Sequence, residues 1–156
     1  MIKWCRTSSV QASADDAFDV IGTNVTVNHP RWEKEVQSIR KLTPGSVGVG
    51  TRAVMVRKEM GRVSESEYEV TEFVPGRCIA FAHPQDSLDF TLRFELTPTR
   101  DTRCDLTVTV TAQPKGALRL MEPLMRLGFP RRSARITDAM IDVIESTVPS
   151  PIGQVG

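Results

Sequence analysis

The C-terminal part of the chain contains, from Ala117 to Thr147, the sequence ALRLMEPLMRLGFPRRSARITDAMIDVIEST. Apolar residues recur in it at intervals of three and four, the period of a helix with one buried face. They are Leu118, Met121, Met125, Phe129, Ile136, Met140 and Ile144. Pro123, Gly128, Pro130 and Arg132 interrupt the first part of this stripe. The pattern predicts a long C-terminal helix and leaves open whether its first half packs in a core or lines a cavity.

The sequence before this helix is predicted to form mostly β-strands. Residues 88–97 and 103–112 alternate between apolar and polar side chains, as strands with one buried face do. Residues 3–10 and 34–42 predict two more strands, and five strands in all are expected after Thr51. Together these segments predict a curved antiparallel sheet of about seven strands.

Two short helices are expected between the first two strands. Ser13 precedes two carboxylates, Asp15 and Asp16, in the pattern of a capped helix start, and the second helix or turn carries Trp32. The fold class is therefore α+β, a helix-grip arrangement in which the sheet wraps around the C-terminal helix. We expect a single domain over residues 1–148 and a flexible tail over residues 149–156.

Composition excludes several classes of function. The chain has 156 residues, 20 of them basic and 19 acidic, so no excess of positive charge favours nucleic-acid binding. No apolar run approaches the roughly 20 residues of a membrane span, and the first residues lack a signal-peptide pattern. The expected location is the cytoplasm.

The cysteines do not indicate a metal site or a disulfide framework. Cys5, Cys78 and Cys104 are odd in number, lie far apart, and form no ligand set with His29 and His83. No phosphate-binding loop, dinucleotide fingerprint or zinc pattern occurs, so we expect no cofactor.

Tight turns at residues 60–61 and 75–76 predict which side chains lie side by side. The first turn pairs Ala53 with Tyr68, Met55 with Ser66 and Arg57 with Ser64. The second turn pairs Tyr68 with His83, Val70 with Phe81 and Glu72 with Ile79. Closing the next hairpin around residues 84–87 sets His83 near Leu88 and Phe81 near Phe90. All three registers agree on one concave face.

The concave face carries an unusual number of polar groups for a core. They are Arg57, Ser64, Ser66, Tyr68 and His83. A buried polar group without a partner costs roughly 1–3 kcal/mol, and a charged one more. Either these groups pair with each other, or a wet cavity or a ligand lies between the sheet and the helix. We favour the cavity.

Four segments, in this order and spacing, resemble the START-like superfamily, also called Bet v 1-like, SRPBCC or helix-grip proteins. They are SADDAFDVI at residues 13–21, HPRW at 29–32, GVGTR at 48–52 and YEVTEFVPGR at 68–77. Within the superfamily the chain is similar to the polyketide cyclase/dehydrase and lipid transport group. The resemblance implies an elongated apolar cavity between the sheet and the long helix, with Trp32 at its mouth.

The expected ligand-binding residues combine the concave face with the helix stripe. They are Trp32, Met55, Ser66, Tyr68, Phe81, His83, Phe90, Met121, Met125 and Phe129. Tyr68 and His83 are the first candidates for holding or protonating a ligand carbonyl. The resemblance adds Arg57, because cyclases of the family tend to place an arginine in this hairpin; here Ser64, Ser66 and Tyr68 occupy the middle strand instead, which weighs against cyclase activity.

Each of these interpretations has a plainer alternative. Tyr68 and His83 could also be core residues that satisfy each other's hydrogen-bonding groups. Trp32 could pack in a core that has no cavity, instead of standing at a cavity mouth. The methionines could serve core packing alone. His29 is interpreted as a capping or surface histidine, and Glu72 as a solvated carboxylate.

Four arginines of the C-terminal helix are expected to lie on a solvated face, which would also attract an anionic group. They are Arg126, Arg131, Arg132 and Arg135.

Three functions follow as hypotheses. The first is binding or carriage of a small hydrophobic molecule, such as a lipid or polyketide-like compound, without catalysis. The second is a cyclase or dehydratase that uses Tyr68, His83 and Arg57. The third is a regulatory or interaction module on the same fold. The sequence indicates neither the ligand nor the oligomeric state.

Overall fold

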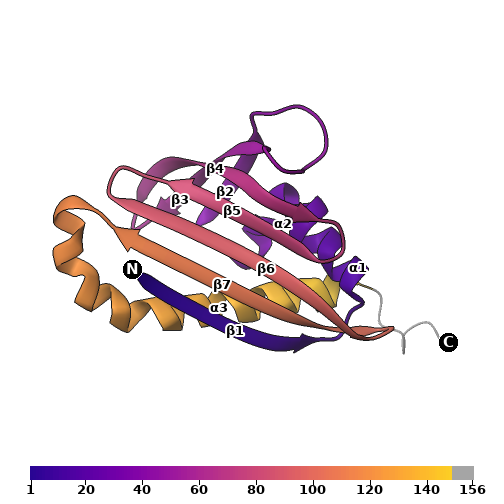
Figure 1. Ribbon diagram of the computed structural model, residues 1–156. Helices are drawn as coiled ribbons and strands as arrows, with labels where there is room; N and C mark the ends of the chain where they lie inside the picture. The colour runs from indigo at the N-terminus through magenta and orange to yellow at the C-terminus, as the bar shows by residue number, and fades with distance from the viewer. Residues whose placement is uncertain (149–156) are drawn as a thin grey trace.

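The computed structural model describes residues 1–148, and the predicted tail, 149–156, lies outside the described residues. Within residues 1–148, seven strands, three α-helices and two short helical turns follow each other (Figure 1). The strands are β1 (Ile2–Val10), β2 (Val36–Lys41), β3 (Arg52–Glu59), β4 (Arg62–Val74), β5 (Cys78–Pro84), β6 (Leu88–Arg100) and β7 (Arg103–Pro114). The helical segments are α1 (Ala14–Phe18), the π-helical turn η1 (Asp19–Thr23), α2 (Val25–Trp32), the 3₁₀ turn η2 (Gly116–Met121) and α3 (Glu122–Thr147).

All seven strands form one antiparallel sheet in the order β1-β7-β6-β5-β4-β3-β2. The sheet curves, and α3 runs along one of its faces, while α2 packs on β2 and α1 contacts β6 and β7 (Figure 1). The predicted helix-grip fold is confirmed, with about seven strands, two short helices after the first strand and a long C-terminal helix.

The first helix starts as its sequence predicts. The Ser13 hydroxyl accepts a hydrogen bond from the backbone N–H of Asp16 at 3.1 Å, and Asp15 and Asp16 lie in the first turn. A side-chain oxygen at this position satisfies one of the free N–H groups of the turn, and the two carboxylates complement the helix dipole. This helix leads through η1 into α2, which carries His29 and Trp32 toward the sheet.

The register between β3 and β4 is the predicted one. Ala53 pairs with Tyr68, Met55 with Ser66 and Arg57 with Ser64. The turn at Met60–Gly61 produces this register with two residues, both at positive φ, the geometry that suits a tight hairpin. Ser64, however, is exposed, so it does not contribute to a buried polar face.

Between β4 and β5 the predicted register holds at Val70–Phe81 and fails beyond it. An irregularity between Val70 and Glu72 shifts the pairing, so Glu72 lies opposite Ala80 and Phe73 lies opposite Ile79. A bulge adds one residue to a strand and reverses which side chains face inward. Phe73 consequently packs on Phe18, with 5.2 Å between ring centroids, while Glu72 forms an ion pair with Arg93 on the outer face.

The predicted register between β5 and β6 is wrong by two residues. His83 pairs with Phe90 and Phe81 with Leu92, because the loop closes between Pro84 and Asp89 rather than between His83 and Leu88. A shift of two keeps the alternation of faces, so Phe90 and Leu92 still point to the same side as His83.

The two halves of the C-terminal helix pack differently. In the second half Met140 and Ile144 are fully buried against the sheet. In the first half Met125 and Phe129 are only half-buried, and Met121 is exposed, which corrects the prediction that it faces the sheet. The helical segment begins at Gly116, next to the predicted start at Ala117, but its first residues form the 3₁₀ turn η2 and not an α-helix.

No helix among residues 1–148 combines the length and the apolar character needed to cross a membrane.

Candidate functional site

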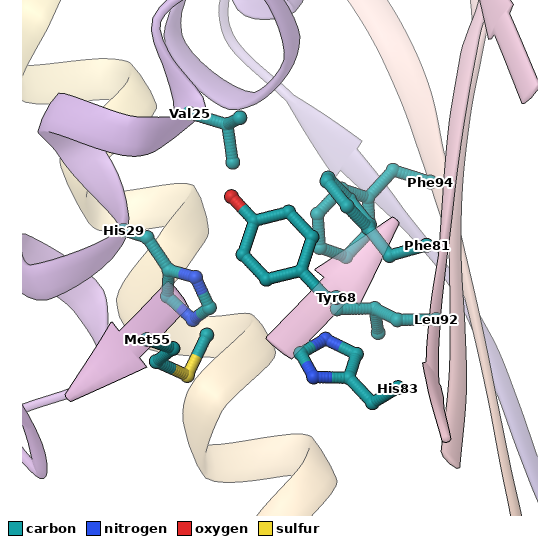
Figure 2. Close-up of a pocket in the computed structure, with 8 residues that line it drawn as sticks. All are labelled: Val25, His29, Met55, Tyr68, Phe81, His83, Leu92 and Phe94. Atoms are coloured by element: carbon teal, nitrogen blue, oxygen red, sulfur yellow. The ribbon is translucent and has the colours of Figure 1, made fainter. Parts of the chain in front are cut away.

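A small cavity lies between α2 and the concave face of the sheet (Figure 2). Its volume is about 10 Å³, room for about one water molecule. Two lining residues come from α2 and six from strands β3 to β6. They are Val25, His29, Met55, Tyr68, Phe81, His83, Leu92 and Phe94. The elongated cavity expected from the resemblance is thus nearly closed in this conformation by its own lining side chains.

Tyr68 places an unpaired hydroxyl in this region. Its side chain is buried, and among residues 1–148 the hydroxyl has no hydrogen-bond partner. Burial raises the pKa of Tyr68 to about 12, so the group is a neutral donor at pH 7. In Figure 2 the hydroxyl points toward Val25 of α2. A buried donor without an acceptor is rare in native proteins and calls for an explanation.

His83 is a neutral imidazole beside this tyrosine. Burial lowers the pKa of His83 to about 4, so the ring is uncharged at pH 7. The rings of His83 and Tyr68 lie 5.1 Å apart, and Phe90 packs edge-on against His83 at 5.8 Å. The two residues are neighbours, as predicted, but they meet through their rings, and the Tyr68 hydroxyl does not bond to the imidazole.

His29 also belongs to the site, contrary to its interpretation as a surface or capping residue. Its ring is buried, stacks on Trp32 at 5.2 Å and lines the cavity. Its Nε2 lies 2.7 Å from Oε2 of Glu33, which is buried as well. Because an ionised carboxylate only accepts, Nε2–H donates to Glu33, and Nδ1 is the nitrogen left to exchange a proton.

Glu33 is the buried centre of a group of charged side chains that extends to the surface, which we call the Glu33 network. Its Oε1 lies 2.7 Å from Nη2 of Arg57 and 3.7 Å from Nη2 of Arg132, and both arginines also contact Glu59. Burial raises the pKa of Glu33, but the hydrogen bond and charge of His29 and the charge of Arg57 outweigh it. The pKa falls to about 2. The carboxylate therefore stays ionised and fixes the tautomer of His29.

The structure brings together part of the predicted ligand-binding set. Four of the ten residues line the cavity, namely Met55, Tyr68, Phe81 and His83. Trp32 is buried behind His29 and does not line it, and Ser66 is half-buried further along β4. Arg57 is not a free carbonyl holder, because Glu33 and Glu59 occupy its guanidinium.

The predicted residues of β6 and α3 lie beside the cavity. The rings of Phe90 and Phe129 meet edge to face, with 6.4 Å between ring centroids, and Met125 is half-buried one turn before Phe129. Met121 lies outside this group, because η2 turns it to solvent. The first half of α3 consequently buries less of its apolar surface than the half that carries Met140.

These positions define what the site can do chemically. The Tyr68 hydroxyl can donate one hydrogen bond, and the imidazole of the neutral His83 can exchange a proton. His29 offers Nδ1 for the same purpose, because its Nε2 is held by Glu33. All three side chains line the cavity together with apolar residues. Among residues 1–148 there is no cluster of three or more His, Cys, Asp or Glu that would hold a metal ion.

Several solved structures are similar to this one. A START superfamily protein from Mycobacterium smegmatis has a TM-score of 0.73 and 16% identity, covering 94% of this chain and 99% of that chain. The Zhui aromatase/cyclase from Streptomyces sp. R1128 has a TM-score of 0.72 and 14% identity, covering 94% and 92%. Norcoclaurine synthase from Thalictrum flavum, in complex with dopamine and hydroxybenzaldehyde, has a TM-score of 0.67 and 16% identity, covering 95% and 88%. Identities this low show a shared fold.

No curated protein sequence matches the chain. The model of one family, described as polyketide cyclase/dehydrase and lipid transport, matches residues 1–145. Since this match includes every strand and nearly all of α3, the chain belongs to the polyketide cyclase/dehydrase and lipid transport family and has its START-like fold.

Proposed function

We propose that the protein binds a small, largely apolar molecule that carries a carbonyl or another hydrogen-bond acceptor. The observation that carries the proposal is the buried Tyr68 hydroxyl, which has no partner among residues 1–148. Leaving such a donor unsatisfied costs roughly 1–3 kcal/mol, and an acceptor on a ligand would remove that cost. The aromatic and aliphatic side chains around it supply the apolar contacts.

The ligand must displace side chains to enter, because the cavity of about 10 Å³ holds no more than a water molecule. The contact of the half-buried Phe129 with Phe90 opens at less cost than the contacts of Met140, because separating a half-buried side chain from the sheet exposes less additional apolar surface than separating a fully buried one. The solved structure of norcoclaurine synthase with dopamine and hydroxybenzaldehyde supports the idea that a similar fold accommodates small aromatic molecules.

The test is a pair of ligands that differ in one acceptor. We expect 2-acetylnaphthalene to bind more tightly than 2-isopropylnaphthalene, which has the same shape without the carbonyl. Tyr68→Phe should weaken binding of the ketone about tenfold, the value of one hydrogen bond, and leave the hydrocarbon unaffected. Isothermal titration calorimetry measures both. Equal binding of the ketone to the wild type and to Tyr68→Phe would contradict the proposal.

A second candidate function is catalysis of the cyclase or dehydratase type, and the pair His29–Glu33 favours it. Glu33 orients His29 so that its Nδ1 is the nitrogen able to accept a proton, and His29 lines the same cavity as Tyr68. A hydrogen bond from Tyr68 to a ligand carbonyl would make the adjacent C–H more acidic, and His29 would remove that proton. Aldol cyclisation and dehydration both begin with such a step.

Proton exchange tests this candidate without knowledge of the natural substrate. In D₂O, the protein should speed deuterium incorporation into the methyl group of 2-acetylnaphthalene, and His29→Ala should remove the acceleration while the ketone still binds. Exchange at the rate of buffer alone, with the ketone shown to be bound, would exclude catalysis and leave the binding function.

A further inference from the structure

The start of the C-terminal helix exposes three leucines on the side away from the sheet. Leu120, Leu124 and Leu127 are 84%, 61% and 74% exposed. Leu124 and Leu127 are three residues apart and lie on one face of α3, and Leu120 is exposed at the end of η2, directly before α3. We call these three residues the outer leucine face. Phe129, which contacts Phe90 of the sheet, and the half-buried Met125 lie on the other side of α3. Three neighbouring exposed leucines form a continuous apolar patch, and such patches mark interaction sites, whereas single scattered apolar residues do not.

Positive charge surrounds this face. Residues 115–135 contain six basic residues and one acidic residue, a net charge of +5 in a chain whose total is +1. Arg126 pairs with Glu122 and Arg132 with Glu59. Arg119 and Arg131 are exposed and form no salt bridge within residues 1–148.

The two arginines lie at either end of the leucines. Arg131 follows Leu127 by four residues and therefore lies on the same side of α3, and Arg119 is the residue next to Leu120 in η2. The rest of the chain has a net charge of −4, so an anionic surface attracts this end of the molecule and repels the remainder. A helix that lies in a membrane interface typically combines exposed apolar side chains with arginines or lysines that have no salt-bridge partner.

We infer that the protein docks on the surface of bilayers that contain anionic phospholipids, through the outer leucine face. The leucines enter the boundary between headgroups and acyl chains, and Arg119 and Arg131 contact phosphate groups. The helix lies on the membrane and does not cross it, in keeping with its charge and hydropathy. This inference uses only the outer side of the helix and does not depend on the proposed ligand site.

Vesicle co-sedimentation tests the inference directly. Full-length protein should sediment with vesicles of 70% phosphatidylcholine and 30% phosphatidylglycerol, and the bound fraction should fall on going from 20 mM to 500 mM NaCl. A variant with Leu120→Ser, Leu124→Ser and Leu127→Ser should lose about 100-fold in partition coefficient, since three apolar side chains no longer enter the interface. Sedimentation with pure phosphatidylcholine should be much weaker.

The matched control carries three serines at exposed valines elsewhere on the molecule, namely Val27→Ser, Val49→Ser and Val74→Ser. Its partition coefficient should equal that of the wild type. Arg119→Gln with Arg131→Gln, a change that touches no packed residue, should weaken binding about tenfold and flatten its salt dependence. Circular dichroism melting curves establish that each variant is folded before binding is compared.

Several outcomes would overturn the inference. The folded wild type could fail to bind anionic vesicles, or it could bind charged and uncharged vesicles equally. The leucine and valine variants could also show equal losses in partition coefficient. A dimer in lipid-free sedimentation velocity that the leucine variant converts to a monomer would also overturn it, because the outer leucine face would then be covered by a second copy of the chain.

Discussion

Replacing Glu33 with glutamine should reveal the strength of the Glu33 network. The substitution keeps the shape of the side chain and removes its charge, so that His29 and Arg57 face a neutral amide in a buried position. Removing one partner of a buried ion pair costs more than the pair contributes, because the remaining charge stays desolvated.

The magnitude follows from the pKa of Glu33. The folded-state pKa is about 2 against an ordinary value of 4.5. The difference corresponds to about 3 kcal/mol of stability, with each pKa unit equal to about 1.4 kcal/mol. The side chain is only 9% exposed, so solvent screening reduces this little. We expect Glu33→Gln to lower the free energy of unfolding at pH 7 by about 3 kcal/mol.

The pH dependence has a definite sign. A carboxyl with a lowered folded-state pKa stabilises the protein fully above its unfolded pKa of about 4.5, and this stability disappears as the pH falls toward about 2. The difference in stability between wild type and Glu33→Gln should therefore be constant from pH 7 to about pH 5 and shrink below it.

Urea unfolding followed by circular dichroism at several pH values measures this difference. Glu67→Gln is the matched control, because Glu67 pairs with Arg52 on the exposed surface of the sheet. It should cost less than about 1 kcal/mol. Equal effects of the two substitutions at pH 7, or a gap for Glu33→Gln that persists unchanged to pH 2, would refute the reasoning.

Three further predictions concern single side chains. Tyr68→Phe should leave the free energy of unfolding unchanged or raise it by about 1 kcal/mol, since it removes a buried donor that lacks a partner; chemical denaturation checks this. Ile144→Ala should cost roughly 2–5 kcal/mol in the same assay, and Leu127→Ala less than about 0.5 kcal/mol, because the first is fully buried and the second is exposed. Cys5 should react with a thiol reagent far faster than the two buried cysteines, whose pKa burial raises to about 11; mass spectrometry after brief labelling identifies the modified residue.

Most of the fold was predictable because two local signals agree. Alternation of side chains marks the strands, and short turns fix their pairing, so the register of Ala53 with Tyr68 follows from a two-residue turn. The pairing of Glu72 was not predictable, because the alternation of apolar and polar side chains does not reveal where a β-bulge lies. The bulge reverses which side chains face inward from that point of β4 onward.

The site was predictable in part for the same reason. Tyr68 and His83 follow from strand register, whereas His29 was missed because a histidine before proline reads as a loop residue. A usable signal was present: His29 and Glu33 are four residues apart, and on a helix this spacing puts both side chains on one face. The bond between them is the interaction that such spacing favours.

The orientation of the first half of the C-terminal helix was not predictable from periodicity alone. Two apolar stripes with helical spacing run side by side there, one through Met125 and Phe129 and the other through Leu124 and Leu127. Periodicity shows that a helix forms, but only packing against the sheet selects which stripe is buried. The 3₁₀ geometry of η2 then moves Met121 out of the buried stripe.

The most direct test of ligand binding uses the fact that Tyr68 is the only tyrosine in the chain. Protein labelled with 3-fluorotyrosine should give a single ¹⁹F resonance for the folded state, which reports on the hydroxyl and its surroundings. Titration with 2-acetylnaphthalene should shift this resonance to a saturating value, and titration with 2-isopropylnaphthalene should shift it less. Binding of the ketone, established by calorimetry, that leaves the Tyr68 resonance unmoved would contradict the account.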